Sequence, residues 1–307
     1  TVTVNWKHWK LIAPTMHDLD AMRARVEDKL EALLPTKSAI AQPMLDAMRH
    51  AVLGGGKRMR PLFACASCEA FGGEVEHALT SGCALEFIHS YSLIHDDLPA
   101  MDDDDIRHGQ PATHIAYGEA NAILAGDSLH SLAFQAVVDS SELNDHSKLR
   151  IIQLLSDAAG WAGMSGGQCL DIEAEGRELQ LNELKALHAA KTGALIRASM
   201  QIGAYSADAH PDKSRYEALS DVGDLIGLAF QIMDDVLDVT QSTAILGKPA
   251  GSDEAHAKNT FPMLMGLEAS QTEAAKLLDQ AIALLQDNQL ATPTLIELVT
   301  RAVHRTY

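Results

Sequence analysis

The chain has 307 residues and a formal net charge of −18, and 47% of its residues are hydrophobic. A surface this acidic repels nucleic-acid phosphates, so we expect no nucleic-acid partner. No apolar run is long enough to predict a transmembrane segment, and the first residues lack the pattern of a secretory signal. These features favour a cytoplasmic protein.

Helical periodicity is common along the chain, whereas alternating strand patterns are scarce. Apolar residues spaced three and four apart predict helices within 77–95, 118–138, 216–239 and 272–288. Glycine, proline and small polar residues predict loops at 53–61, 70–74, 206–214 and 245–262. None of these loops is long enough for a domain linker, so we expect one all-α domain covering 1–307.

A basic, glycine-rich stretch, LGGGKRMRP, carries Lys57, Arg58 and Arg60 beside three glycines. Glycine lets backbone amides approach an anion closely, although the spacing is not that of a Walker motif. The next stretch, FACASCEAF, contains a CxxC formed by Cys65 and Cys68. Without a second cysteine pair, we interpret these thiols as small residues packing on a helix rather than as a zinc or redox site.

The first acidic cluster, HDDLPAMDDDDIRHG, covers residues 95–109. Pro99 disfavours helix at Leu98, so Asp96 and Asp97 should end a helix while Asp102 returns on a turn. The acids would then converge through a bend.

The second acidic cluster, QIMDDVLDV, lies on a predicted helix. Its apolar stripe comprises Leu219, Val222, Ile226, Ala229, Met233 and Val236. A separate stripe comprises Gly227, Gln231, Asp234 and Asp238, with Asp235 beside it. Oxygen ligands without clustered cysteine or histidine favour magnesium or calcium, and the ligand spacing of an EF-hand is absent. A solvated acidic helix face is the alternative for either cluster alone.

Six motifs occur in an order that resembles the trans-isoprenyl diphosphate synthase family, in particular its bacterial farnesyl diphosphate synthases. They are GGGKRMRP, EFIHSYSLIHDDLPAMDDDDIRHGQPATH, GGQCLDI, KTGAL, QIMDDVLDV and LGKPAGSDEAHAKNTFP. The resemblance implies a helical bundle around a deep central cavity, usually as a homodimer. It also implies condensation of isopentenyl diphosphate with dimethylallyl or geranyl diphosphate. Magnesium would be the cofactor, with three ions around the bound diphosphate and manganese as a possible replacement.

The resemblance also implies roles for individual residues. Asp96 and Asp102, with Asp97 beside them, would hold magnesium on the allylic diphosphate, and Asp234, with Asp235 and Asp238, would hold the remaining ion. Contacts to that diphosphate or its metals would come from Arg107, Lys191, Thr192, Gln231, Lys248 and Lys258. Isopentenyl diphosphate would bind Lys57, Arg60 and His89. No side-chain nucleophile is needed, because metals and cations stabilise the departing diphosphate.

One position departs from the family pattern, because His108 stands where a second arginine is usual. Histidine cannot form the bidentate fork of arginine, so we expect weaker or pH-dependent binding of isopentenyl diphosphate.

Product length is predicted from Tyr91 and Ser92, which lie about one helical turn, roughly 6 to 7.5 Å, below Asp96. A ring at that level should stop a growing hydrocarbon chain, so we expect farnesyl diphosphate as the product. The alternatives are a geranylgeranyl diphosphate synthase, a class I terpene cyclase and a non-catalytic partner subunit.

Overall fold

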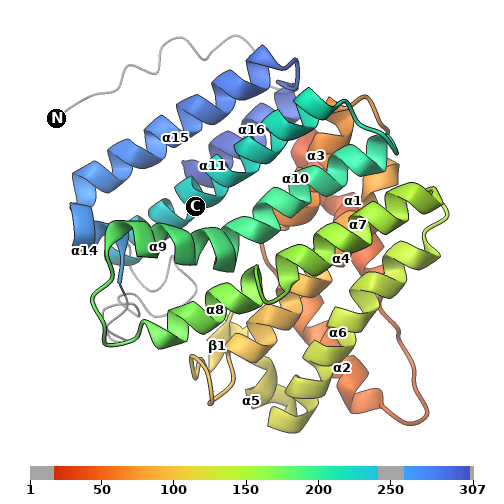
Figure 1. Ribbon diagram of the computed structural model, residues 1–307. Helices are drawn as coiled ribbons and strands as arrows, with labels where there is room; N and C mark the ends of the chain where they lie inside the picture. Colours follow the sequence, from red (N-terminus) through yellow and green to blue (C-terminus); the bar gives the residue numbers. More distant parts are fainter. Residues whose placement is uncertain (1–16, 241–258, 305–307) are drawn as a thin grey trace.

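The computed structural model describes residues 17–240 and 259–304, and these residues are almost entirely helical (Figure 1). The first half contains α1 (His17–Leu33), α2 (Gln42–Leu53), α3 (Met59–Ala70), α4 (Val75–Asp96), α5 (Thr113–Tyr117), α6 (Glu119–Asp139) and α7 (Asp145–Ala159). The second half contains α8 (Met164–Glu173), α9 (Leu181–His188), the π-helical turn η2 (Ala189–Gly193), α10 (Ala194–Ala207), α11 (Lys213–Thr240), α14 (Phe261–Met265), α15 (Leu267–Asp287) and α16 (Pro293–Val303). Within the described residues, β structure is limited to the antiparallel hairpin of β1 (Ile106–Arg107) and β2 (Gln110–Pro111). The all-α prediction is confirmed.

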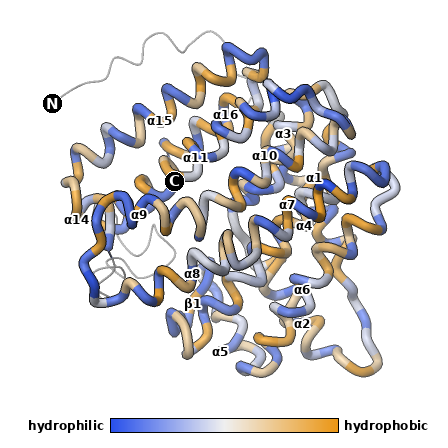
Figure 2. Tube along the Cα trace, in the orientation of Figure 1, coloured by the Kyte–Doolittle hydropathy of each residue, from blue (hydrophilic) through white to orange (hydrophobic). Residues whose placement is uncertain are grey.

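Helix α10 lies at the centre of the bundle, and eleven of its 14 residues are buried. It packs against α3, α4, α7 and α11, while α15 covers α11 and α6 covers α4 (Figure 1). Along α15 the colour in Figure 2 alternates between hydrophilic and hydrophobic, as expected for an outer helix with one buried face. None of the helices in the described ranges is long and apolar enough to cross a membrane.

Small residues let α3 and α10 approach each other closely. A Cβ atom added to Gly203 of α10 would lie 2.3 Å from the carbonyl oxygen of Ala64. Cys65 and Cys68 are free and buried in this packing, and burial raises the pKa of each thiol to about 12. The interpretation of the CxxC as small packing residues is therefore confirmed.

Helix α11 presents the predicted apolar stripe to the core. Leu219, Val222, Ile226 and Ala229 are fully buried, and Met233 is half-buried. The loop predicted at 53–61 is too long, however, because α3 already begins at Met59. Pro61 lies in the first turn of α3, where its missing N–H removes no helical hydrogen bond.

Candidate active site

Two adjoining cavities open between α4, α8, η2 and α11. The first, called the polar cavity below, has a volume of about 350 Å³ and is lined by Lys57, Asp102, His108, Asp171, Gln231 and Asp234, among others. The second, called the apolar cavity, has a volume of about 600 Å³ and is lined by Tyr91, Ser92, Met101, Met164, Ile172 and Leu195, among others. Both are lined by Arg60, His89, Leu93, Lys191 and Thr192. A charged head group in the first cavity can therefore continue into an apolar chain in the second.

The first acidic cluster bends as its sequence predicts. Helix α4 ends at Asp96, and the backbone N–H of Asp102 donates to the carbonyl oxygen of Asp96 over 2.8 Å. Asp103 completes the turn with a left-handed φ of 52°. The bend returns Asp102 to the end of α4, so that Asp96 lines the apolar cavity and Asp102 lines the polar one.

Arg107 and Asp97 form an ion pair outside both large cavities. The guanidinium donates to Asp97, in part from Nε over 2.9 Å, and also to Asp104 over 3.2 Å. Asp97 is only 2% exposed. Burial lowers the pKa of Arg107, but the hydrogen bond and charge of Asp97 outweigh this effect and raise it overall. Arg107 therefore remains charged and, in this structure, anchors the hairpin to the end of α4.

The π-helical turn η2 carries Lys191 and Thr192 into the wall that the cavities share. The ammonium group of Lys191 donates to Asp171 of α8 over 2.6 Å. The hydroxyl of Thr192 donates to the side-chain oxygen of Gln231 on α11 over 3.1 Å. π-Helical turns often occur at functional sites, because they redirect side chains out of the regular helical register.

The second acidic cluster divides between the cavity and the protein interior. Asp234 lines the polar cavity. Asp235 lines it as well, but its carboxylate accepts from the amide of Gln231 and from the backbone N–H of Phe261, each over 3.0 Å. Asp238 is 5% exposed and lines neither large cavity. Asp234 is thus the member of this cluster that is best placed for a ligand.

The side chains predicted to bind isopentenyl diphosphate come together. Lys57, Arg60, His89 and His108 all line the polar cavity. Burial and the charge of Arg60 hold the pKa of His89 well below its ordinary value, so His89 is neutral at neutral pH. A neutral histidine here would offer one N–H donor to a phosphate oxygen.

Tyr91 and Ser92 lie together in the wall of the apolar cavity, as their position on α4 predicts. The Tyr91 ring packs edge-on against His95 and against His130 of α6, with ring centroids 5.4 and 5.2 Å apart. These contacts hold the tyrosine ring against α6.

Three site residues were missed in the sequence. Asp171 pairs with Lys191, and Gln168 lines the apolar cavity. Both belong to the motif GGQCLDI, whose place in the order of the six motifs could have pointed to them. His188 stacks on Phe261 with ring centroids 5.6 Å apart, and burial lowers its pKa to about 4. His188 lies in none of the six motifs, so no sequence signal pointed to it. Lys248 and Lys258 lie outside the described residues.

The donors around the polar cavity suit magnesium, because Asp102 and Asp234 offer hard carboxylate oxygens and no thiol. The described residues contain no group of three or more side chains already arranged to hold a metal. Any ion bound there would therefore need further oxygens, such as those of a diphosphate.

The polyprenyl synthetase family model matches residues 41–298. The chain belongs to the polyprenyl synthetase family. It is 45% identical to the farnesyl diphosphate synthase of Escherichia coli over 270 residues, covering 86% of this chain and 89% of the relative. It is 42% identical to a large subunit of a heterodimeric geranylgeranyl pyrophosphate synthase of Arabidopsis thaliana over 258 residues, covering 82% of this chain and 68% of that protein.

Solved structures agree with this assignment of the polyprenyl synthetase fold. The geranyltransferase of Helicobacter pylori complexed with magnesium and isoprenyl diphosphate matches with a TM-score of 0.84 and 32% identity, covering 96% of this chain and 98% of that one. A geranyltransferase of Legionella pneumophila matches with a TM-score of 0.82 and 33% identity, covering 94% and 97%.

Proposed function

We propose that this polyprenyl synthetase condenses isopentenyl diphosphate with dimethylallyl and geranyl diphosphate to give farnesyl diphosphate. The observation that supports this most directly is the shared wall of Arg60, His89, Leu93, Lys191 and Thr192, which joins a charged cavity to an apolar one. Diphosphates fit the first cavity and a prenyl chain fits the second.

In the proposed reaction, the C1–O bond of the allylic substrate breaks and leaves an allylic cation. Lys191 and Thr192 would bind the departing diphosphate, while Lys57, Arg60 and His89 would orient isopentenyl diphosphate. Its terminal carbon, C4, then attacks C1 of the cation, which transfers the positive charge to C3 of isopentenyl diphosphate, and a proton is lost from C2 to the released diphosphate. The apolar cavity excludes water that would otherwise capture the cation.

Magnesium, held by Asp96, Asp102 and Asp234 together with diphosphate oxygens, would neutralise the charge that builds up on the leaving group. We propose three such ions. We propose an indirect role in the metal sites for Asp97, Asp235 and Asp238, without direct contact to the ions. Asp97 and Asp235 already bind protein groups, and Asp238 is buried. Arg107, Gln231, Lys248 and Lys258 remain proposed contacts of the diphosphate or its metals.

Product analysis tests the proposal. Incubation with isopentenyl diphosphate and geranyl diphosphate should give a fifteen-carbon diphosphate with magnesium and no condensation after chelation. Condensation without any divalent ion, or none with it, would contradict the proposal. Geranylgeranyl diphosphate is the second candidate product, because relatives with that activity in their names are 42% identical to this chain.

We further propose that residues 1–307 form a single domain and that the enzyme is a cytoplasmic homodimer. Exposed apolar side chains gather on α5 and the adjoining start of α6, where Ile115, Ile123 and Leu124 are 52%, 43% and 51% exposed. A second copy would cover them.

A further inference from the structure

Arg58, in the middle of the glycine-rich basic loop, lines the polar cavity but is almost wholly buried. Only 3% of it is exposed, and it directly precedes α3. Its φ of 54° and ψ of 29° are left-handed, a conformation that costs free energy in a residue other than glycine. Surrounding contacts must therefore hold this residue in place.

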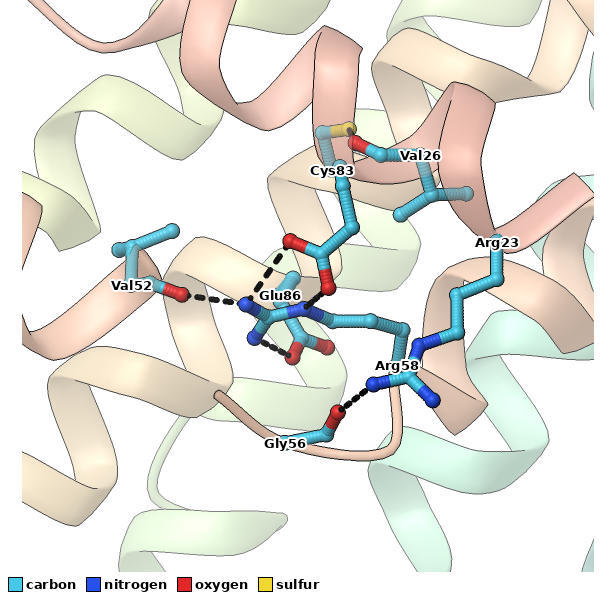
Figure 3. A network of polar contacts seen from close by, with 8 residues as sticks. Arg23, Val26, Val52, Gly56, Arg58, Cys83 and Glu86 are labelled. Atoms are coloured by element: carbon cyan, nitrogen blue, oxygen red, sulfur yellow. Dashed lines mark hydrogen bonds and ion pairs between the residues drawn. The ribbon is translucent and has the colours of Figure 1, made fainter. Parts of the chain in front are cut away.

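These contacts come from α1, α2 and α4, and Figure 3 shows those with Val52 and Glu86. The guanidinium donates to Glu27 of α1 over 2.8 and 3.1 Å and to Glu86 of α4 over 2.9 Å. It also donates to the carbonyl oxygen of Val52, near the end of α2, over 2.6 Å. Each of its three nitrogens is thus engaged by the protein, which leaves Arg58 poorly suited to bind a diphosphate itself.

The contacts of Arg58 lie close to the residues that are predicted to bind isopentenyl diphosphate. Lys57 directly precedes Arg58, Arg60 follows two residues later, and His89 lies one turn beyond Glu86 on α4. A further contact from α1 reaches the same loop, because Arg23 donates to the carbonyl oxygen of Gly56 over 2.9 Å (Figure 3).

We propose that Arg58 is a positioning residue, whose buried contacts with Glu27, Glu86 and Val52 set the spacing of Lys57, Arg60 and His89 for isopentenyl diphosphate. This inference rests on the proposed function only for the identity of that ligand. Glu27 offers the cleanest test, because it holds Arg58 from α1 and does not line the polar cavity.

The matched control is Arg25. It lies on the same helix as Glu27 and pairs with Glu76 of α4 over 2.6 Å, but this pair is about half exposed. Arg25→Gln therefore weakens an ionic link between α1 and α4, whereas Glu27→Gln weakens the ionic link between α1 and Arg58 in the loop.

The first measurement is hydrogen exchange of the backbone amides from Gly54 to Leu62, a range that includes the first helical bond of α3, from the N–H of Leu62 to the oxygen of Arg58. Exchange should be faster in Glu27→Gln than in the wild type and unchanged in Arg25→Gln. Equal exchange in all three proteins would overturn the proposal, whether or not the enzyme condenses prenyl diphosphates.

The second measurement is steady-state kinetics. We expect Glu27→Gln to raise KM for isopentenyl diphosphate about fivefold, with kcat and KM for geranyl diphosphate within about twofold of the wild type. Arg58→Lys keeps the positive charge but loses the forked guanidinium group, and it should also raise KM for isopentenyl diphosphate. An unchanged KM, or an equal loss in all three constants, would contradict the inference, whereas an inactive wild type would contradict the proposed function alone.

Discussion

His108 places a neutral ring where the family resemblance predicts a cation. It has a left-handed φ of 52° and lies in the polar cavity, where a Cβ on Gly56 would be 3.5 Å from its Cε1 atom. Burial, followed by the charges of Arg107, Arg58 and Lys57, lowers its pKa. At neutral pH this side chain contributes a dipole rather than a charge to the binding of a diphosphate.

We expect His108→Arg to lower KM for isopentenyl diphosphate about three- to tenfold, because an arginine there would add a charge-assisted hydrogen bond. Steady-state kinetics with geranyl diphosphate as the other substrate checks this, and KM for geranyl diphosphate serves as the internal control. An unchanged KM for isopentenyl diphosphate would show that position 108 does not reach this substrate.

His188 makes the fold sensitive to acid. Its pKa is about 4 in the folded protein, against the ordinary 6.5, so between these values the unfolded chain binds more protons. Its contribution to stability is therefore lost as the pH falls from 6.5 towards 4. Denaturant unfolding should show the wild type losing about 3 kcal/mol more than His188→Phe between neutral pH and about pH 4. His146→Gln, at an exposed position, should lose as much free energy of unfolding over this pH range as the wild type does.

At the scale of elements, the crossing of α11 with η2 determines where Lys191 and Thr192 lie. A Cβ atom added to Gly227 would lie 2.8 Å from the Cα atom of Gly193. On the other side of η2, a Cβ on Gly167 would lie 2.2 Å from the backbone nitrogen of Lys191. Two glycines on α8 and α11 thus hold the π-helical turn between them.

Gly227→Ala should push η2 away from α11, lowering kcat at least tenfold and the free energy of unfolding by about 1 to 3 kcal/mol. Gly193→Ala is the matched control, because a Cβ there meets its nearest atom at 3.5 Å and φ is −62°. Kinetics and denaturant unfolding of both variants test this, and equal behaviour would contradict it.

Tyr91 of α4 lines the apolar cavity and packs on His130 of α6, and we expect its ring to limit the length of the product. Tyr91→Ala would remove the ring that packs on His130, so products longer than fifteen carbons should appear. Tyr91→Phe keeps the ring and should keep the product length. Chromatography of the dephosphorylated products distinguishes the two variants. A fifteen-carbon product from Tyr91→Ala would mean that another residue limits the product length.

For the whole molecule, the proposed dimer can be tested on its exposed apolar face. Leu124→Glu on α6 should shift the mass measured by light scattering towards that of a monomer, because a charge would be buried between the two copies. Leu149→Glu on α7, at a position that is 67% exposed, should not change the mass. If both variants have the wild-type mass, α6 does not form the interface.

Much of the fold was predictable because helical periodicity and Pro99 act locally. The buried stripe of Leu219 to Ala229 and the return of Asp102 to Asp96 both follow from short-range rules. The pairing of Arg107 with Asp97 was not predictable, since it depends on the path of the hairpin between them. The role of Arg58 was hidden for the same reason: its partners Glu27 and Glu86 lie about thirty residues away on either side.

The buried contacts of Arg58 also constrain how this sequence can diverge. Losing Arg58 alone would leave Glu86, which is 4% exposed, as an uncompensated charge, and losing Glu86 alone would leave one buried guanidinium nitrogen of Arg58 without its acceptor. Apolar replacement of all the partners at once would remove that penalty, but every single step towards it is unfavourable. These positions should therefore behave as one epistatic unit, in which each substitution is tolerated only in the background of the others.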